Sequence, residues 1–540
     1  MKKELDLLIQ GGMIVDGSGS EPFSGDIGIE GDRIALVRGH AERNCPETLH
    51  AKEVIEAGDL IIAPGFIDTH AHSEFTLLAD PRAEGKICQG ITTEINGNCG
   101  LSAGPLYGEA FKQREGDLRE LGIEERWTTL QEYLEILEQR GPFLNFATLA
   151  GHGNIRACVV GYRDKEPTPA ESAEMRVLFG KALTDGAIGL STGLIYPPGV
   201  YADTGELIDL CRVMTNKDGE RPGIYTSHMR SEGDMLIESL HEVVEIGRAS
   251  GVAVHVSHIK TSGERNWRKI DEALAVLERA RGEGIAVTGD RYPYTASSTD
   301  LDTVLPAWVY EGGSDEELRK LKSDVLRARI KREVTDEHPD MQYWENTYVS
   351  SVASEKNRWM EGMSIALISQ KEGAGPVDTV FNILIAEDLR VGAIFSSMKE
   401  ENLRRFLSLA YVMIGTDSSA RSVSGATRKG KPHPRGFGSF PRFLGKYVRD
   451  DSLMELGEAM RKITRFPAET FGIRERGIIR QGAFADVVVF DYRRMRDTAT
   501  YSEPFLKPEG IHYVVVNGAP AVWEGQLTGV RAGRVLRHGG

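Results

Sequence analysis

Short apolar runs alternate with longer helical patterns between about residues 62 and 473. Eight of these runs are typical of strands, and they end near His72, Asn98, His152, Thr192, His228, His258, Tyr292 and Asp417. Apolar residues at helical spacing over 235–250 and 267–281 predict helices between some of them. Strands that alternate with helices form parallel βαβ units, and eight units are typical of a (β/α)8 TIM-like barrel. The predicted fold class is therefore α/β, with any active site at the carboxyl ends of the strands.

The two ends of the chain differ from this middle part, because they consist of short strands and glycine turns. Residues 7–17 predict a strand, a glycine turn and a second strand, and residues 26–34 predict a hairpin. Similar strand-and-turn segments occupy 485–490, 513–518 and 529–534. These segments predict one small β-sandwich formed by residues 1–61 and 474–540, beside a barrel of residues 62–473.

One stretch of the middle part does not follow the alternation. From about 298 to 394 the strand-like runs are too far apart for a single helical connection, and a charged run over 315–332 is typical of a helix. We expect this stretch to form an inserted lid subdomain above the mouth of the barrel.

Composition excludes several classes of partner. The 540 residues carry a net charge of −15, so no broad basic face is available for nucleic acid or an anionic membrane. The basic cluster 428–431 is more typical of a solvated loop than of a phosphate site. Acidic residues near the start do not fit a signal peptide, and no apolar run approaches the ~18 residues of a membrane span. A cytoplasmic protein is expected, with its oligomeric state undetermined.

Cysteine spacing indicates the same compartment. The five cysteines are Cys45, Cys88, Cys99, Cys158 and Cys211. Their number is odd and they form no CxxC pair, which favours a reducing compartment over a disulfide framework. Cys99 falls where a strand opens into a loop, and Cys88, Cys158 and Cys211 are expected to be packing residues.

The first strand of the middle part ends in a pattern that suits a metal. His70 and His72 are separated by one residue and follow an apolar run. Side chains two apart in a strand point to the same side, so the two imidazoles can reach one ion. Such a pair also arises often by chance, and other ligands are needed to support a metal site.

Further candidate ligands follow at later strand ends. A thiolate at Cys99 would be a strong zinc ligand, although a free cysteine is commonly just a small buried hydrophobe. His228 and His258 end two successive strands, and beside the histidine pair they favour a metal over isolated structural roles. Strand parity predicts that His255 faces the outer helices. If the strand continues as far as Lys260, parity also predicts that Lys260 enters the pocket with His258.

Asp417 ends the last strand. A carboxylate beside a metal-bound water can accept its proton and later pass it to a leaving amine, whereas the alternative role is to cap a turn. His152 stays open between substrate contact and a backbone hydrogen bond. Asp68 is expected to order the strand end before the histidine pair, and Arg230 to support His228.

The order of these motifs resembles the amidohydrolase superfamily of metal-dependent hydrolases, and more closely the N-acyl-D-amino-acid deacylases (D-aminoacylases). The resemblance is carried by residues 63–72, 90–100, 189–194, 227–233, 256–260, 292–294, 433–435 and 476–486. It therefore extends over nearly the whole chain. It implies zinc-dependent hydrolysis of the amide bond of an N-acyl-D-amino acid, a small-molecule substrate, to a carboxylate and a free D-amino acid.

The resemblance also implies roles for individual residues. A tightly bound Zn²⁺ would be held by Cys99, His228 and His258. A second, weaker metal position would use His70, His72 and Asp417, with Asp417 also the catalytic carboxylate. The residues similar to those that contact the substrate carboxylate are Lys260, Tyr292, Ser298 and Arg435.

Related functions remain as alternatives. Hydantoinases and dihydroorotases resemble this chain but bridge two metals with a carboxylated lysine on the fourth strand, and residues 187–193 contain no lysine. Cys99 is expected to take the place of that ligand. The alternatives are an amidohydrolase that acts on a cyclic amide or on a dipeptide with a C-terminal D-residue, and a non-catalytic relative, which would not need to keep every ligand.

Overall fold

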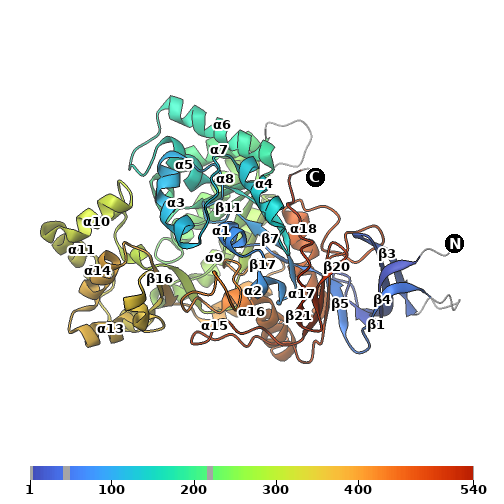
Figure 1. The fold of residues 1–540 in the computed structure, drawn as a ribbon. Coiled ribbons are helices and arrows are strands. Elements are labelled where there is room, and N and C mark those ends of the chain that lie inside the picture. Colours follow the sequence, from blue (N-terminus) through green and yellow to red (C-terminus); the bar gives the residue numbers. More distant parts are fainter. Residues whose placement is uncertain (1–3, 41–48, 216–222, 539–540) are drawn as a thin grey trace.

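Parallel strands form the centre of the molecule in the computed structural model, which describes residues 4–40, 49–215 and 223–538 (Figure 1). One parallel sheet contains β6 (Phe66–Asp68), β7 (Ile91–Asn96) and β8 (Asn145–Thr148). A second contains β9 (Ala150–Gly151), β10 (Gly189–Gly193), β11 (Ile224–His228), β12 (Ala253–Val256), β13 (Val287–Arg291) and β17 (Val412–Ile414). The predicted strands are thus confirmed, and each ends within a few residues of the predicted position.

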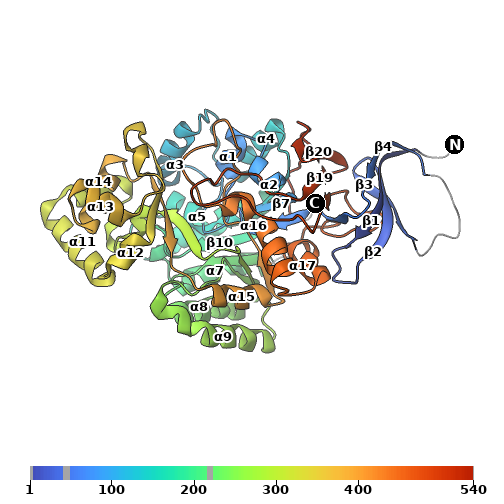
Figure 2. The same cartoon turned by 90° about the horizontal axis from the view of Figure 1, so that it is seen from below.

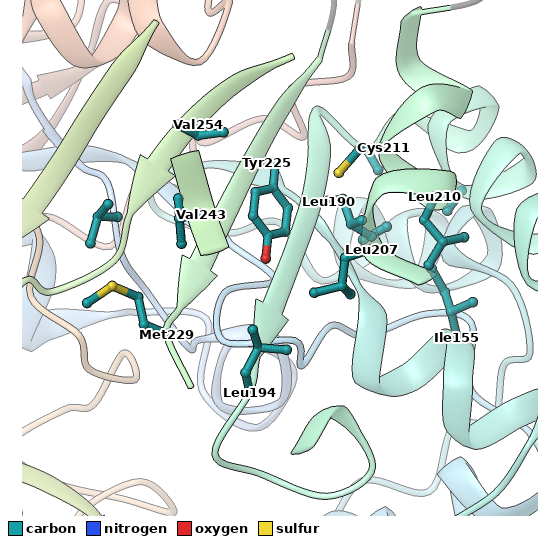
Figure 3. Close-up of a cluster of buried hydrophobic side chains, with 14 of the residues drawn as sticks. Ile155, Leu190, Leu194, Leu207, Leu210, Cys211, Tyr225, Met229, Val243 and Val254 are labelled. Atoms are coloured by element: carbon teal, nitrogen blue, oxygen red, sulfur yellow. The ribbon is translucent and has the colours of Figure 1, made fainter. Parts of the chain in front are cut away.

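Helices pack on the outer face of these strands. Among them are α6 (Pro169–Asp185), α7 (Thr204–Thr215), α8 (Leu236–Ser250) and α9 (Ile270–Gly282). Figure 3 shows Leu190 and Tyr225, from two neighbouring strands, beside Leu207 and Cys211 of α7, and Val254 of the next strand near Val243 of α8. The predicted helices over 235–250 and 267–281 are confirmed, except that a 3-10 turn occupies the first residues of the second.

The inner face of the strands has its own apolar core. Ile67, Ile95, Ile224 and Met413 pack there against Phe471, which directly follows α18 (Arg465–Thr470). All of these residues are at most 3% exposed. This layer closes the space below the strand carboxyl ends, so polar side chains at those ends face away from it.

The prediction that His255 faces the outer helices is wrong. Its ring centroid lies 5.3 Å from that of Phe471, and its Nε2 lies 2.8 Å from an oxygen of Asp290. The parity count fails because β12 ends at Val256, so His258 lies beyond the strand and does not share its alternation.

Strands from both ends of the chain join in one nine-stranded sheet. The N-terminal part supplies β1 (Leu5–Ile14), β2 (Phe23–Glu30), β3 (Arg33–Gly39), β4 (Ala51–Glu56) and β5 (Ile61–Pro64). The C-terminal part supplies β18 (Val487–Phe490), β19 (Ile511–Val516), β20 (Ala519–Trp523) and β21 (Gln526–Leu527). The two parts meet where β18 pairs with β5.

Two predictions for the N- and C-terminal parts of the chain differ from the structure. The glycine turn expected within 7–17 is a β-bulge inside β1, where the register with β2 shifts between Ile9 and Gly12; Gly11 adopts φ of 81°, a value that glycine accommodates. The strand expected over 529–534 is not formed. The predicted hairpin of β2 and β3 is confirmed. Cys45 lies outside the described residues.

The segment that interrupts the alternation is a separate layer of structure. It contains an antiparallel sheet of β14 (Ala296–Asp300), β16 (Val391–Ser396) and β15 (Thr347–Val352). Its helices include α10 (Ser314–Lys322), α11 (Asp324–Glu337), α12 (Met341–Glu345), α13 (Ile365–Glu372) and α14 (Pro376–Ala386), so the charged run is helical as predicted. The helices of this segment and strands β1 to β4 lie at opposite ends of the molecule (Figures 1 and 2).

The remaining helices connect strands or cover the site. They are α1 (Glu74–Ala79), α2 (Glu84–Ile87), α3 (Gly108–Glu120), α4 (Leu130–Arg140), α5 (His152–Val159), α15 (Glu400–Ser408), α16 (Arg435–Arg442) and α17 (Leu456–Ile463). Among the described residues, none of the helices has both the length and the apolar character that crossing a membrane requires.

The apolar layer beneath the strand ends generates a stability prediction. Replacing Phe471, which is 3% exposed, with alanine should leave a cavity and lower the free energy of unfolding by about 3–5 kcal/mol. Urea unfolding followed by circular dichroism measures the change. The control variant is Phe23→Ala, since Phe23 is 37% exposed and its loss should cost far less. Equal losses in the two variants would contradict this placement of Phe471.

Candidate metal centre and active site

Six side chains come together at the carboxyl ends of the central strands in two groups that could each hold a metal ion. One group consists of His70, His72, Cys99 and Asp417, and the other of Cys99, His228 and His258. Within each group the potential ligand atoms all lie within 4.8 Å of one another. Cys99 belongs to both groups, so two ions held there would share its sulfur.

The sulfur of Cys99 is close to three imidazoles. It lies 3.2 Å from His70 Nε2, 3.6 Å from His228 Nδ1 and 3.4 Å from His258 Nε2. Asp417 completes the first group, with its Oδ1 3.3 Å from His72 Nε2. Sulfur and imidazole nitrogen together are typical zinc donors, and a thiolate with two imidazoles leaves one position of a tetrahedron open.

Backbone conformation directs three of these side chains into the cluster. Cys99, His258 and Asp417 have φ of 52°, 34° and 50°, in the left-handed region that non-glycine residues seldom adopt. Each lies two or three residues beyond the end of a strand. Such strained residues persist only where the surroundings hold them, and they concentrate at functional sites. Here the Asp417 amide donates to the His70 carbonyl at 2.8 Å.

Two carboxylates that the sequence analysis did not single out hold the histidines in place. Asp290 at the end of β13 accepts from the His258 amide at 2.6 Å, and its Oδ2 lies 3.2 Å from His70 Nδ1. Glu232 Oε1 lies 2.8 Å from His258 Nδ1. Partners of this kind fix the orientation of a ligand imidazole. Asp290 lies two residues before Tyr292, where a strand was predicted to end, and Glu232 lies four residues after His228. Nothing in the sequence distinguishes these two acids from acids at the surface.

A buried cluster of charged side chains orders the segment that carries His70. The Lys86 ammonium lies 2.8 Å from Asp68 and 2.6 Å from Glu94, and all three side chains are fully buried. Asp68 also accepts hydrogen bonds from the amides of His70 at 3.2 Å and Thr416 at 2.8 Å. Asp68 thus orders the strand end as predicted. It ties the segment after β6 to the segment after β17.

The four predicted carboxylate-binding residues all line the same cavity as the metal candidates. Arg435 Nη1 pairs with Asp417 Oδ2 at 2.8 Å, and its guanidinium carbon lies 4.6 Å from the centre of the Tyr292 ring. Lys260 pairs with Glu232. The Ser298 hydroxyl donates to the Ala393 carbonyl at 2.9 Å. Tyr292 is fully buried, and its hydroxyl has no hydrogen-bond partner among the described residues.

His152 and Arg230 do not have the contacts that the sequence analysis expected for them. His152 neither lines the cavity nor bonds to backbone through Nε2, which lies 2.7 Å from Glu206 Oε1. Arg230 lines the cavity, but its hydrogen bonds go to Glu242 and to two backbone carbonyls and not to a candidate ligand. Of the cysteines, Cys88, Cys158 and Cys211 are free and lie apart from both metal-ligand groups.

Neighbouring groups keep the two acidic candidate ligands, Cys99 and Asp417, in the ionised forms that bind a cation. Burial raises the pKa of the Cys99 thiol, but the imidazoles of His70 and His258 outweigh burial and hold this pKa well below its usual value. The sulfur is therefore available as thiolate, the form that binds metals. Burial likewise opposes ionisation of Asp417, but Arg435 outweighs it and keeps the pKa of that carboxyl well below its usual value.

A cavity of about 1150 Å³ opens above this cluster. Its walls come from the central strand ends on one side and from the inserted segment on the other, including β14 and residues at the end of α11. The size suits a small organic molecule. His70 is fully buried beneath the cavity, whereas His72, Cys99 and Asp417 line it.

Comparisons with known proteins agree with this geometry. A profile of the amidohydrolase family matches residues 53–297 and 420–522. A D-aminoacylase of Alcaligenes xylosoxydans xylosoxydans is 35% identical over 98% of this chain and 97% of its own length. The chain belongs to the amidohydrolase family. The resemblance stated from the motifs is thereby confirmed.

Two further relatives cover the amidohydrolase chain from end to end. An N-acyl-D-glutamate deacylase of the same Alcaligenes organism is 35% identical over 100% of this chain and 98% of its own length. The crystal structure of an N-acyl-D-glutamate deacylase from Bordetella bronchiseptica, complexed with zinc and a phosphonate mimic of the tetrahedral intermediate, superposes with a TM-score of 0.81 and 33% identity. The match spans 99% of this chain and 100% of that one, which confirms the α/β fold.

The shared position of Cys99 generates a prediction about metal content. In the Cys99→Ala variant both groups lose their common ligand, so the purified protein should retain less than about a tenth of the wild-type zinc, in line with the large contribution of thiolate to zinc binding. Inductively coupled plasma mass spectrometry measures the content. Cys158→Ala serves as the matched control, because Cys158 lies in α5 and in neither group. Unchanged zinc in Cys99→Ala would contradict the assignment.

Proposed function

We propose that the chain is a zinc-dependent N-acyl-D-amino-acid deacylase, which hydrolyses the linear amide of its substrate to a carboxylate and a free D-amino acid. The observation that carries the proposal is the convergence of Cys99 with the imidazoles of His228 and His258 beside Asp417, at the base of one cavity. The relatives that match over their whole length carry the names D-aminoacylase and N-acyl-D-glutamate deacylase.

The metal would be held by residues whose chemistry fits zinc. Cys99, His228 and His258 are proposed to hold the tightly bound ion, since one thiolate and two imidazoles suit zinc and leave a position for substrate or water. His70, His72 and Asp417 are proposed to complete a second, weaker position through the shared sulfur. When bound, zinc polarises a carbonyl and makes water available as a nucleophile at neutral pH.

Asp417 is proposed to handle the proton. Its carboxylate faces the centre of the cluster, with Oδ1 3.6 Å from His70 Nε2 and 13% of the side chain exposed. A carboxylate in this place can take a proton from the attacking water and give it to the departing amino group. Arg435, which contacts the other oxygen of Asp417, keeps that carboxylate oriented.

The substrate carboxylate is proposed to bind beside Asp417, which Arg435 contacts. Arg435, Lys260 and Tyr292 bring two cations and an unpaired hydroxyl to one wall of the cavity. A planar guanidinium suits two-pronged contact with a carboxylate. Ser298 follows on β14, and its backbone carbonyl already accepts from Arg435 Nη2 at 3.1 Å. This anchor would leave the amide above the metal candidates.

We also propose how the strands and the inserted segment are organised into domains. The strand order runs β6-β7-β8 and then β9-β10-β11-β12-β13-β17, with β9 two residues after β8 in the chain, and a bridge joins Ala71 to Ser418. This order supports a closed (β/α)8 barrel over residues 62–473, a β-sandwich of residues 1–61 and 474–540, and a lid over about 298–394.

A substrate panel tests the function. Purified protein with measured zinc content is assayed on N-acetyl-D- and N-acetyl-L-amino acids, a dihydropyrimidine and a dipeptide with a C-terminal D-residue. We expect hydrolysis of N-acetyl-D-amino acids at least about 100-fold faster than of their L-enantiomers, because the carboxylate anchor, the metal and the cavity wall beside the side chain together hold three substituents of the α-carbon. Faster hydrolysis of the cyclic amide or the dipeptide, or no hydrolysis at all, would contradict the proposal.

The role of Asp417 generates a separate prediction. Asp417→Asn removes the proton acceptor but leaves Cys99, His228 and His258 intact, so kcat should fall by about 10²- to 10⁴-fold while the tightly bound zinc is kept. Asp271→Asn is the control, since that side chain is 81% exposed and pairs only with Arg405 among the described residues. Activity of Asp417→Asn within a few fold of wild type would refute the role.

A further inference from the structure

A buried arginine lies directly behind the proposed carboxylate anchor. Arg291 ends β13 and is only 1% exposed, and it is not one of the residues that line the cavity. Its Nη2 donates to the Tyr294 carbonyl at 2.8 Å and lies 2.9 Å from the Met398 sulfur. Its Nε and Nη1 have no hydrogen-bond partner among the described residues, and no carboxylate in that part of the chain forms an ion pair with it.

An unpaired guanidinium is unfavourable in a protein interior. Burial removes the water that stabilises the charge, and a carboxylate partner normally offsets this loss. Arg291 instead contacts the aromatic ring of Tyr292, whose centre lies 4.1 Å from the guanidinium carbon. A cation over an aromatic ring recovers only part of the lost stabilisation. An anion that binds close to Tyr292 would therefore stabilise Arg291 further, and the buried charge would strengthen the binding of that anion in return.

Tyr292 connects this buried charge with the cavity. The tyrosine lines the cavity, and its hydroxyl, which is fully buried, has no hydrogen-bond partner among the described residues. Two further cations lie near the same ring. The guanidinium carbon of Arg435 lies 4.6 Å and the ammonium nitrogen of Lys260 lies 5.9 Å from the ring centre. The hydroxyl is thus an available donor beside three positive charges.

The balance of charge around Tyr292 depends on Arg291. Arg435 and Lys260 each pair with a carboxylate of the cluster. Arg291 has no such partner among the described residues, so it leaves one net positive charge beside the tyrosine. Burial raises the pKa of the Tyr292 hydroxyl, but the three cations outweigh burial and hold this pKa below its usual value. A hydroxyl in such surroundings is a strong hydrogen-bond donor to an anion.

We propose that Arg291 is a positioning residue of the substrate-carboxylate site, and that its buried charge attracts the α-carboxylate through Tyr292 without touching it. The inference rests on the proposed function and adds a source of specificity to it. The Tyr292 hydroxyl would donate to the carboxylate, Arg435 would bind it directly, and Arg291 would keep the region positive although Arg435 is already paired with Asp417. The site then selects a free α-carboxylate over a carboxyl group that is amidated and carries no charge.

The test separates the charge of Arg291 from its packing. Arg291→Gln removes the charge but can still donate to the Tyr294 carbonyl, whereas Arg291→Lys keeps the charge. Each variant is assayed on the N-acetyl-D-amino acid that the wild type hydrolyses fastest, with the C-terminal amide of that compound as an inhibitor. We expect Arg291→Gln to raise KM for the acid about 10-fold or more, with kcat and the inhibition constant of the amide within a few fold of wild type. Arg291→Lys should recover most of the lost affinity.

Arg248→Gln is the matched control, because Arg248 lies in α8, is 50% exposed and pairs with Glu245 and Glu283; its KM should match the wild type. Equal weakening of acid and amide in Arg291→Gln would indicate a structural role and overturn the inference, as would an unchanged KM for the acid or a lysine variant as weak as the glutamine variant. Loss of an unpaired buried charge should not lower the unfolding temperature. Arg291→Met is a second neutral variant, with the same expected split, if Arg291→Gln does not fold.

A binding measurement is independent of turnover. Isothermal titration calorimetry on the zinc-loaded protein compares D-leucine with 3-methylbutylamine, the same molecule without its carboxylate. The carboxylate should tighten binding about 10-fold or more in the wild type and far less in Arg291→Gln. An equal gain in the two proteins would overturn the inference, whether or not the protein is a deacylase. Absence of hydrolysis across the substrate panel, together with a gain that depends on Arg291, would refute the deacylase function and keep the inference.

Discussion

The position of one sulfur atom is the constraint on which the site depends. Cys99 Sγ lies within 3.6 Å of nitrogen atoms from His70, His228 and His258, although β6, β7, β11 and β12 bring these residues from distant parts of the chain. Strained backbone after β7 and β12 is needed to aim these side chains inward. Buried acids such as Asp290 hold the imidazoles, and residues of the inserted segment line the cavity above the cluster. The fold therefore serves to bring soft donors together above an apolar layer.

Much of the fold followed from the sequence, because strand and helix periods are local signals. The eight central strands and the helices over 235–250 and 267–281 were predicted for this reason. The errors arose where tertiary context decides. Gly11 lies in a bulge within a strand where a turn was expected, and His255 faces inward because β12 ends before His258. Neither the end of a strand nor a bulge is visible in periodicity.

The candidate metal ligands could be predicted from the sequence, whereas the residues that hold them in place were harder to predict. Histidines and a cysteine at strand ends carry a chemical signal of their own, and family motifs ordered them. Glu232 and Asp290 have the same residue types as any surface acid, so their contacts with His258 appear only in three dimensions.

The most direct test of this account is zinc K-edge X-ray absorption spectroscopy of the wild-type protein loaded with one equivalent of zinc. If Cys99 binds the ion with His228 and His258, the spectrum contains a single sulfur neighbour at about 2.3 Å and imidazole nitrogens at about 2.0–2.1 Å. A first shell made only of nitrogen and oxygen, without sulfur, would contradict the central claim.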